Sequence, residues 1–148
     1  MAAPTRTPPA RSRDDVLLDT GVLVALHNRT DPLHARARSW LAGFGGQLHS
    51  VEPVLTEAAF FLPARLRAAL ADVAAAGVIR IHHPDAAGLA RIAQLLRKYA
   101  SLDPDWADVS LVWLGEHLGA RRIATIDTTD FGVYRLNGRT RFELELLG

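Results

Sequence analysis

Short apolar runs alternate along the chain with longer segments in which hydrophobic residues recur every three or four positions. The runs are rich in Val, Ile and Leu, which is typical of strands buried on both faces of a parallel sheet. The segments between the runs have helical spacing, so the whole pattern predicts an α/β fold in which helices cover a mainly parallel sheet. The predicted strands are Val16–Asp19, Gln47–Val51, Val78–His82, Arg122–Asp127 and Phe142–Leu146.

The helical segments also predict which side chains face the sheet. We expect Phe61 and Leu62 to pack inward in one helix and Leu89 in another, because they share a face with other apolar residues. Asp103 is expected to cap the helix that carries Asp108, with Pro104 at its first position, where no backbone donor is needed. The predicted helices are Thr20–Asn28, Asp31–Phe44, Pro53–Leu62, Pro63–Ala76, Ala86–Tyr99 and Asp103–Leu118.

Asp108 is the most informative polar position of the last of these helices. It lies beside an apolar stripe that includes Ala107 and Leu111, and no Lys or Arg lies within one turn of it. An unpaired charge at the edge of a buried surface is costly, so its carboxylate needs a partner. A metal ion, a distant arginine or the helix dipole could fill that role, and a carboxylate in water at the rim of the core is the alternative.

Other acids occupy positions that converge on the same edge of the sheet. Asp19 and Asp127 each end a predicted strand, and sites in open parallel sheets form outside the carboxyl ends of the strands. Glu57 lies on a helix that can reach this edge. The alternative for Asp19 is a helix N-cap. The alternative for Glu57 is a solvated surface position, and Glu52 is the other acid of this helix, at the helix start where negative charge is favoured.

Converging carboxylates repel one another, and this repulsion favours a divalent cation between them. At about 4 Å the repulsion is roughly 4 kcal/mol at an effective dielectric of about 20. A ligand set made only of oxygens fits Mg²⁺ or Mn²⁺. The adjacent His82 and His83 are poor candidates for one metal ion, because neighbouring residues on a strand point to opposite faces. The expected chemistry is polarisation of a phosphoryl oxygen and activation of water.

Composition limits the class of protein more than its function. The 148 residues are 49% hydrophobic and 22% charged, with a net charge of only +1, so no strong basic field indicates a nucleic-acid partner. There is no cysteine and no apolar run long enough to span a bilayer, and we expect a cytoplasmic protein without a membrane contact. Residues 1–14 are rich in Pro and Arg and are expected to form a flexible tail before a domain at residues 15–148.

Four segments carry a resemblance to a known family. They are Leu18–Leu23, Pro53–Ala58, Asp105–Leu111 and Ile123–Asp127, the last followed by Asp130–Phe131. In this order and spacing the sequence resembles PIN-domain ribonucleases, specifically VapC-type toxins of bacterial toxin–antitoxin pairs. The resemblance implies a PIN-like three-layer α/β/α sandwich, Mg²⁺-dependent cleavage of RNA, a homodimer and inhibition by a cognate antitoxin.

The resemblance also assigns roles to acidic residues of this chain. Asp19, Glu57, Asp108 and Asp127 match the acidic catalytic quartet of the family, and Asp105 and Asp130 match recurrent but less central positions. Asp19 and Asp108 are expected to be the primary metal ligands. An arginine of the antitoxin could bind among these acids, since its planar guanidinium group donates hydrogen bonds to paired carboxylates. Apolar residues of the antitoxin could bind between the helix from Thr20 and the helices of residues 53–76.

Two other classes of protein remain as alternatives. A phosphatase of the haloacid dehalogenase type also begins with a strand that ends in Asp, but it needs a second Asp where this chain has Gly21 and normally uses a lysine, and the only one, Lys98, lies in a helix interior. The other alternative is a PIN-like domain that binds metal without catalysis or with a different specificity.

For a ribonuclease, the candidate phosphate contacts are Arg65, Arg67, Arg91 and Arg97, with solvated surface positions as the alternative for each.

Overall fold

A five-stranded sheet with the strand order β3-β2-β1-β4-β7 organises the protein, whose computed structural model describes residues 14–146. All four strand pairs in this sheet are parallel, which confirms the α/β fold predicted from the sequence. β1 lies at the centre, and its Val16, Leu17 and Leu18 are completely buried. The strands are β1 (Asp15–Leu18), β2 (Gln47–Val51), β3 (Ile79–His82), β4 (Arg122–Thr125) and β7 (Glu143–Leu146).

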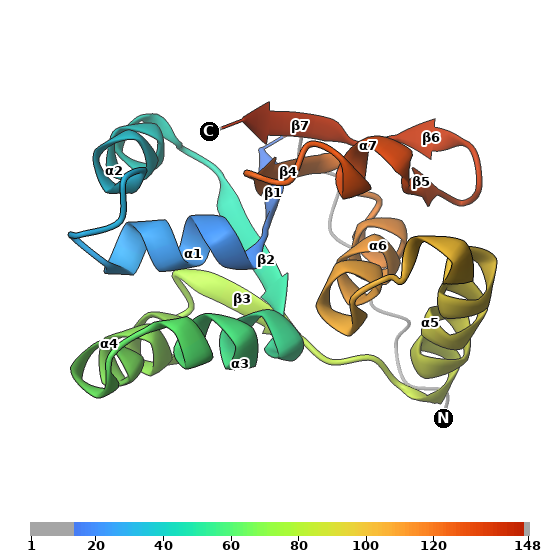
Figure 1. Ribbon diagram of the computed structural model, residues 1–148, viewed down its shortest axis with the longest axis horizontal. Helices are drawn as coiled ribbons and strands as arrows, with labels where there is room; N and C mark the ends of the chain where they lie inside the picture. The colour runs from blue at the N-terminus through green and yellow to red at the C-terminus, as the bar shows by residue number, and fades with distance from the viewer. Residues whose placement is uncertain (1–13, 147–148) are drawn as a thin grey trace, which may run out of the picture.

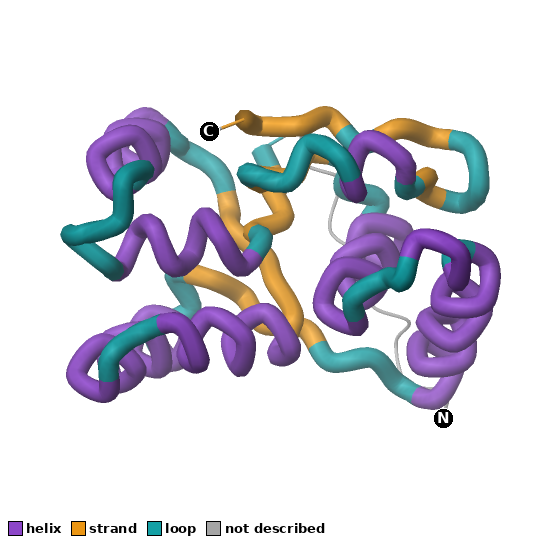
Figure 2. Tube along the Cα trace, viewed as in Figure 1, coloured by secondary structure: helices purple, strands orange, loops and turns teal. Residues whose placement is uncertain are grey.

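Helices cover both faces of this sheet and complete the three layers (Figures 1 and 2). One layer holds α1 (Thr20–His27), α2 (His34–Gly43), α3 (Glu52–Phe61) and α4 (Ala64–Ala75), and the other holds α5 (Ala86–Lys98) and α6 (Trp106–Leu118). α6 packs closely on β1, because a Cβ atom at Gly115 would lie 3.3 Å from Leu17 Cδ1. No helix within residues 14–146 is long and apolar enough to cross a membrane.

The segment after β4 contains short elements that hydrophobic periodicity does not detect. α7 (Asp130–Val133) is followed by the antiparallel pair β5 (Arg135–Leu136) and β6 (Thr140–Arg141). Asn137 and Gly138 have φ values of 51° and 70°, which are the left-handed conformations that a tight hairpin turn requires. Glu116 of α6 accepts a hydrogen bond from Asn137 N and also pairs with Arg91, so this hairpin, α5 and α6 form one unit.

The prediction that Asp103 caps α6 is wrong. Asp103 ends a short 3-10 helix, η1 (Ala100–Leu102), with φ 48° and ψ 59°, and α6 begins only at Trp106. An N-cap residue has an extended backbone, whereas Asp103 is in the left-handed region, so the chain does not enter a helix at Pro104. Asp105 is the cap instead, and its Oδ1 accepts a hydrogen bond of 2.6 Å from Ala107 N.

Two side chains predicted to pack inward are largely exposed. Phe61 is 58% exposed and Leu89 is 48% exposed, whereas Leu62 is buried as predicted. Phe61 continues the helical face of the buried Val54 and Ala58, but it is the last residue of α3 and the core does not cover its ring. The predicted N-terminal tail lies outside the described residues except for Asp14, and the predicted domain boundary at residue 15 therefore remains a prediction.

Candidate metal centre

The candidate metal centre lies at the carboxyl ends of β1 and β4. These strands are neighbours in register, with Leu18 beside Ala124, and Asp19 N extends the pairing with a hydrogen bond of 3.1 Å to Ala124 O. The next residues along the two strands therefore approach each other. Asp19 follows β1 and Asp127 follows β4 by two residues, which places both acids at the edge predicted from the sequence.

Asp19 is held in one orientation by hydrogen bonds to both carboxylate oxygens. Its Oδ1 accepts from Thr20 N at 2.7 Å, and its Oδ2 accepts from Thr125 Oγ1 at 2.8 Å. Asp19 is therefore the N-cap of α1, which is the alternative considered from the sequence, and its role as a metal ligand remains a prediction. Burial raises the pKa of Asp19, with Asp127 and Asp105 adding to the shift, while the two hydrogen bonds lower it.

Thr125 connects Asp19 to Asp127 and is a site residue that sequence reasoning missed. Its side chain is completely buried, and its hydroxyl donates to Asp19 and accepts from Asp127 N at 2.8 Å. Asp127 Oδ1 in turn accepts from the backbone N–H groups of Thr129 and Asp130, at 3.1 and 3.0 Å. This chain of bonds folds the segment after β4 back toward the site and positions Asp130.

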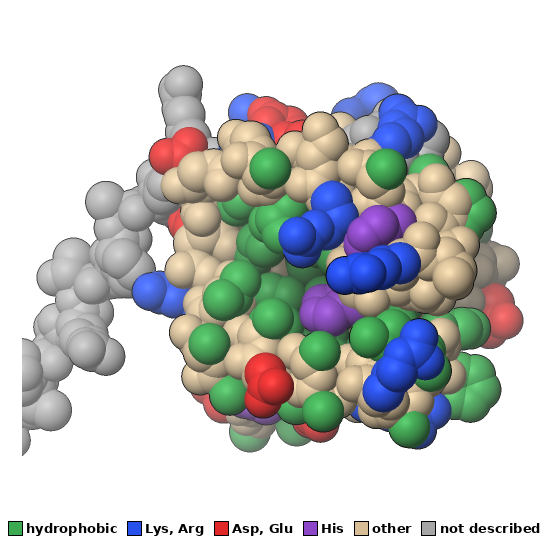
Figure 3. All heavy atoms as spheres, turned by 90° about the vertical axis from the view of Figure 1, so that its left-hand side faces the viewer, with side chains coloured by type: hydrophobic (Ala, Val, Ile, Leu, Met, Phe, Trp, Pro, Cys, Tyr) green, Lys and Arg blue, Asp and Glu red, His purple; other side chains and the backbone are tan. Residues whose placement is uncertain are grey.

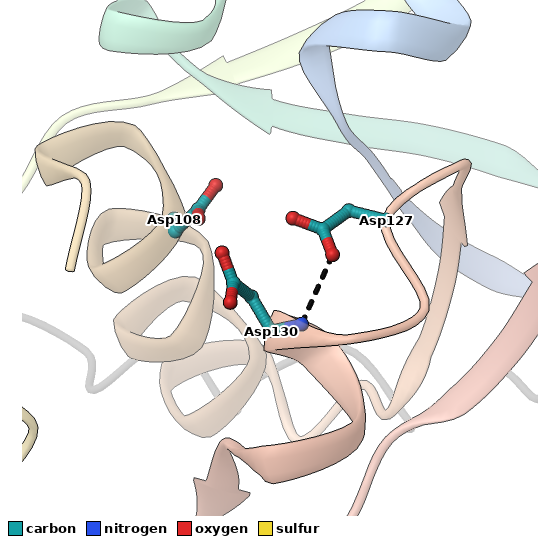
Figure 4. A group of neighbouring side chains, drawn as sticks. All are labelled: Asp108, Asp127 and Asp130. Atoms are coloured by element: carbon teal, nitrogen blue, oxygen red, sulfur yellow. Dashed lines mark hydrogen bonds between the residues drawn. The ribbon is translucent and has the colours of Figure 1, made fainter. Parts of the chain in front are cut away.

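Asp108, Asp127 and Asp130 bring carboxylate oxygens within 4.8 Å of one another (Figure 4). Asp108 comes from the first turn of α6, and the other two come from the loop after β4 and the start of α7. Burial raises the pKa of Asp108 to about 8, and the further causes are the carboxylates of Asp19, Asp105, Asp127 and Asp130. Oxygen ligands with this mutual repulsion fit a hard divalent cation such as Mg²⁺ or Mn²⁺.

Glu57 and Thr20 extend the site toward α3. Burial raises the pKa of Glu57, and Asp105 and Asp19 raise it further, which places all three acids in one electrostatic group. Thr20 Oγ1 is buried and has no hydrogen-bond partner among the described residues, although it is close enough to Glu57 to lower the pKa of that carboxyl. The Thr20 hydroxyl therefore lies near the Glu57 carboxyl and could also bind a water molecule of a hydrated cation.

The structure brings two of the four acids named from the sequence, Asp108 and Asp127, into the closest carboxylate cluster. The closest set contains Asp130, which the family resemblance ranked as less central, and does not contain Asp19 or Glu57. Asp130 could have been noticed because Asp127 lies three residues before it, which is the spacing of a side chain that caps a turn. The assignment of Asp19 and Asp108 as primary ligands remains a prediction.

The arginines considered as phosphate contacts are partly committed to protein acceptors. Arg67 Nε donates to Ala59 O and Leu62 O at the end of α3, at 2.9 and 3.1 Å. Arg91 makes two hydrogen bonds to Glu116, which lies about 12 Å along α6 from Asp108 at about 1.5 Å per residue. Arg65 and Arg97 are exposed on α4 and α5.

We expect the substitution Thr125→Val to weaken Mg²⁺ binding by about 10- to 100-fold, the range found when groups that orient metal ligands are removed. The change keeps the shape of the side chain but releases Asp19 Oδ2 and leaves Asp127 N without its acceptor. Isothermal titration calorimetry would measure the change. Two control variants, Thr125→Ser, which keeps the hydroxyl, and Thr128→Val, which removes an exposed hydroxyl, should bind Mg²⁺ like the wild type. If Thr125→Val also binds Mg²⁺ as tightly as the wild type, the Thr125 hydroxyl does not organise the site.

Comparisons with known proteins identify the family and the fold. A sequence model described as the PIN domain matches residues 16–136. The crystal structure of VapC20 from Mycobacterium tuberculosis, described as a sarcin-ricin loop cleaving toxin, matches with a TM-score of 0.71 and 19% sequence identity. The match covers 77% of this chain and 91% of the VapC20 chain, and at this identity it shows a shared fold. The search of curated protein sequences found no match.

Proposed function

The chain belongs to the PIN domain family, and on this basis we propose that it is a Mg²⁺- or Mn²⁺-dependent endoribonuclease. The observation that supports the proposal best is the group formed by Asp108, Asp127 and Asp130, whose carboxylate oxygens lie within 4.8 Å of one another. Family membership also argues against the phosphatase alternative, which belongs to a different family.

Each residue of the site has a role in this proposal. A bound divalent cation would neutralise the scissile phosphate, polarise its phosphoryl oxygen and activate water for attack. Asp108, Asp127 and Asp130 would hold the cation, and Asp19 would add a carboxylate that Thr20 N and Thr125 Oγ1 keep in a fixed orientation. Glu57, whose pKa is raised by burial and by neighbouring acids, would accept a proton from the attacking water.

We further propose that the protein acts as the toxin of a toxin–antitoxin pair, as a homodimer. VapC20, which shares this fold, is a toxin, and this supports the role by analogy of fold. Several acids with raised pKa values would also attract a guanidinium group in place of the metal ion, which is how an antitoxin arginine could block the site.

A surface suited to apolar antitoxin residues lies over the layer of α1 to α4. Figure 3 shows a hollow lined by hydrophobic side chains and bordered by basic and His side chains on the side of the molecule at the left of Figure 1. Val24 of α1, Leu55 of α3 and Leu66 of α4 are only partly buried against the core. An amphipathic peptide could cover such a surface.

The test of the nuclease is cleavage of RNA with Mg²⁺, compared with EDTA and with Asp19→Ala. We expect cleavage only for the wild type with metal, because EDTA removes the cation and Asp19→Ala removes a carboxylate that is proposed to hold it. Expression of the wild type in a bacterial host should arrest growth, and expression of Asp19→Ala should not. Mg²⁺ binding without any RNA cleavage would favour the alternative of a non-catalytic PIN-like domain, and cleavage that survives EDTA would exclude the proposed metal chemistry.

A further inference from the structure

Three exposed aromatic side chains gather beside the acidic site. Among residues 14–146, the large hydrophobic side chains with the greatest exposure are Phe60 at 78%, Phe61 at 58% and Trp106 at 54%. All three line a single open cleft of about 540 Å³ that runs along α3 and is bounded on its other side by the start of α6. Leaving a large apolar side chain in water forgoes about 1.5–3 kcal/mol of burial free energy, so their collection in one place needs an explanation.

The arrangement of these rings suits a flat ligand. Phe60 and Phe61 meet edge to face, with ring centroids 5.4 Å apart and an interplanar angle of 85°, so their faces point in different directions. Trp106 is the first residue of α6 and follows the N-cap Asp105, whose hydrogen bond to Ala107 N fixes the start of the helix. The cleft therefore offers aromatic faces on two elements that the core holds in place.

Charge decides which flat ligands fit. The lining includes Glu52, Glu57 and Asp105 but no Lys or Arg. Such a lining repels a phosphate group and attracts neutral rings with exocyclic amino groups, because carboxylates accept hydrogen bonds from these groups, which adenine, guanine and cytosine have and uracil lacks. Stacking of nucleobases on aromatic side chains is a general mode of single-strand recognition.

The cleft adjoins the candidate metal centre, because its lining residues Asp105, Trp106 and Ala107 directly precede Asp108 in the chain. Glu57 and Asp105 line the cleft, and both also interact electrostatically with acids of the metal centre: Glu57 with Asp19, and Asp105 with Asp108. A phosphodiester held at the metal centre would therefore place an attached base beside the aromatic rings. A base that remains paired in a duplex cannot occupy the cleft.

We propose that the cleft of Phe60, Phe61 and Trp106 is a nucleobase-binding subsite that takes one unpaired base next to the scissile phosphate, with a preference for adenine, guanine or cytosine over uracil. The inference rests on the proposed nuclease function and adds a substrate class to it: RNA that is unpaired at the cleavage site. Phe60, Phe61 and Trp106 act as positioning residues, since they contact the base and not the reacting phosphate.

The first experiment measures cleavage of an RNA hairpin whose loop carries an abasic position at each site in turn. In the wild type, removal of the base that occupies the cleft should lower kcat/KM by about 5- to 150-fold, which corresponds to the stacking energy of one base. Trp106→Leu should show a similar loss on the intact hairpin and no further loss on the abasic one, whereas Trp106→Phe should retain most of the wild-type rate. Val78→Ala alters an exposed side chain outside the cleft lining and should have no effect.

The second experiment separates this inference from the proposed function, because it does not require cleavage. Adenosine 5′-monophosphate in the presence of Mg²⁺ should quench the tryptophan fluorescence of the wild type more strongly than uridine 5′-monophosphate, and Trp106→Phe should remove the difference. Quenching without RNA cleavage would leave the subsite standing and contradict the nuclease. RNA cleavage at the wild-type rate by Trp106→Leu and Phe60→Leu would overturn the subsite. If these variants also convert a wild-type dimer to monomers while cleavage is unchanged, the cleft is a self-association surface instead.

Discussion

Replacing Asp108 with asparagine is expected to lower the rate of Mg²⁺-dependent RNA cleavage by about 10³-fold or more. The substitution removes one of three carboxylates whose oxygens lie within 4.8 Å of one another, without changing the size of the side chain. Loss of several kcal/mol of transition-state stabilisation by the metal corresponds to a rate effect of this order. Single-turnover cleavage of a labelled RNA, with the variant at saturating concentration, would measure it.

Asp72→Asn is the matched control for this experiment. Asp72 is an exposed residue of α4, so the same chemical change should leave both the rate and the fold unaffected. Thermal unfolding of the two variants would verify that any loss of activity does not come from misfolding. Wild-type cleavage by Asp108→Asn would show that the metal ion binds elsewhere or that Asp127 and Asp130 are sufficient to hold it.

The positions of Asp19 and Asp127 could be predicted from the sequence because they depend on strand polarity alone. Each acid follows a short apolar run, and parallel strands present their carboxyl ends at one edge whatever their order in the sheet. Both acids would lie at this edge even if β1 and β4 were not neighbours. The position of Asp108 could also be predicted from the sequence, since helical spacing places it beside a buried stripe.

Thr125 could not be assigned in this way because its role depends on register. Its hydroxyl reaches Asp19 only because β4 lies next to β1, with Ala124 beside Leu18. A threonine in a buried strand is common, and nothing in its sequence neighbourhood indicates which strand will be adjacent. Asp130 has the same limitation, since its place in the cluster follows from a turn that Asp127 Oδ1 stabilises.

Exposed aromatic residues were the other feature that the sequence concealed. Hydrophobic spacing predicted that Phe61 packs inward, because periodicity records which residues are apolar and not whether a partner exists to cover them. The helix ends at this residue, and the structure leaves its ring in the cleft with Phe60 and Trp106. The residue that was wrongly predicted to be buried therefore lies beside the proposed active site. Functional sites are where apolar side chains most often depart from the burial that their spacing predicts.

The metal-free protein should become more stable, not less, when Asp108 is replaced by asparagine. The folded protein holds the pKa of Asp108 at about 8, whereas an unfolded chain would have the ordinary value of 3.8. At any pH between these values the unfolded state releases a proton that the folded state keeps, so the free energy of unfolding falls as pH rises, and the loss is complete above about pH 8. The asparagine side chain of the variant has no such proton to release, so the variant should lack this decline.

The measurement is the difference in the free energy of unfolding between Asp108→Asn and wild type, from urea titrations in EDTA at pH 5 to 9. We expect this difference to grow with pH and to level off above about pH 8, with a total of about 2 kcal/mol after discounting the pKa shift for partial exposure. His82, whose pKa burial and His49 lower to about 4, makes both proteins less stable as pH falls below about 6.5, and its effect cancels in the difference. Mg²⁺ should reverse the order by stabilising only the wild type. A difference that does not change with pH would mean that Asp108 titrates normally and that the acids are further apart in solution than in this structure.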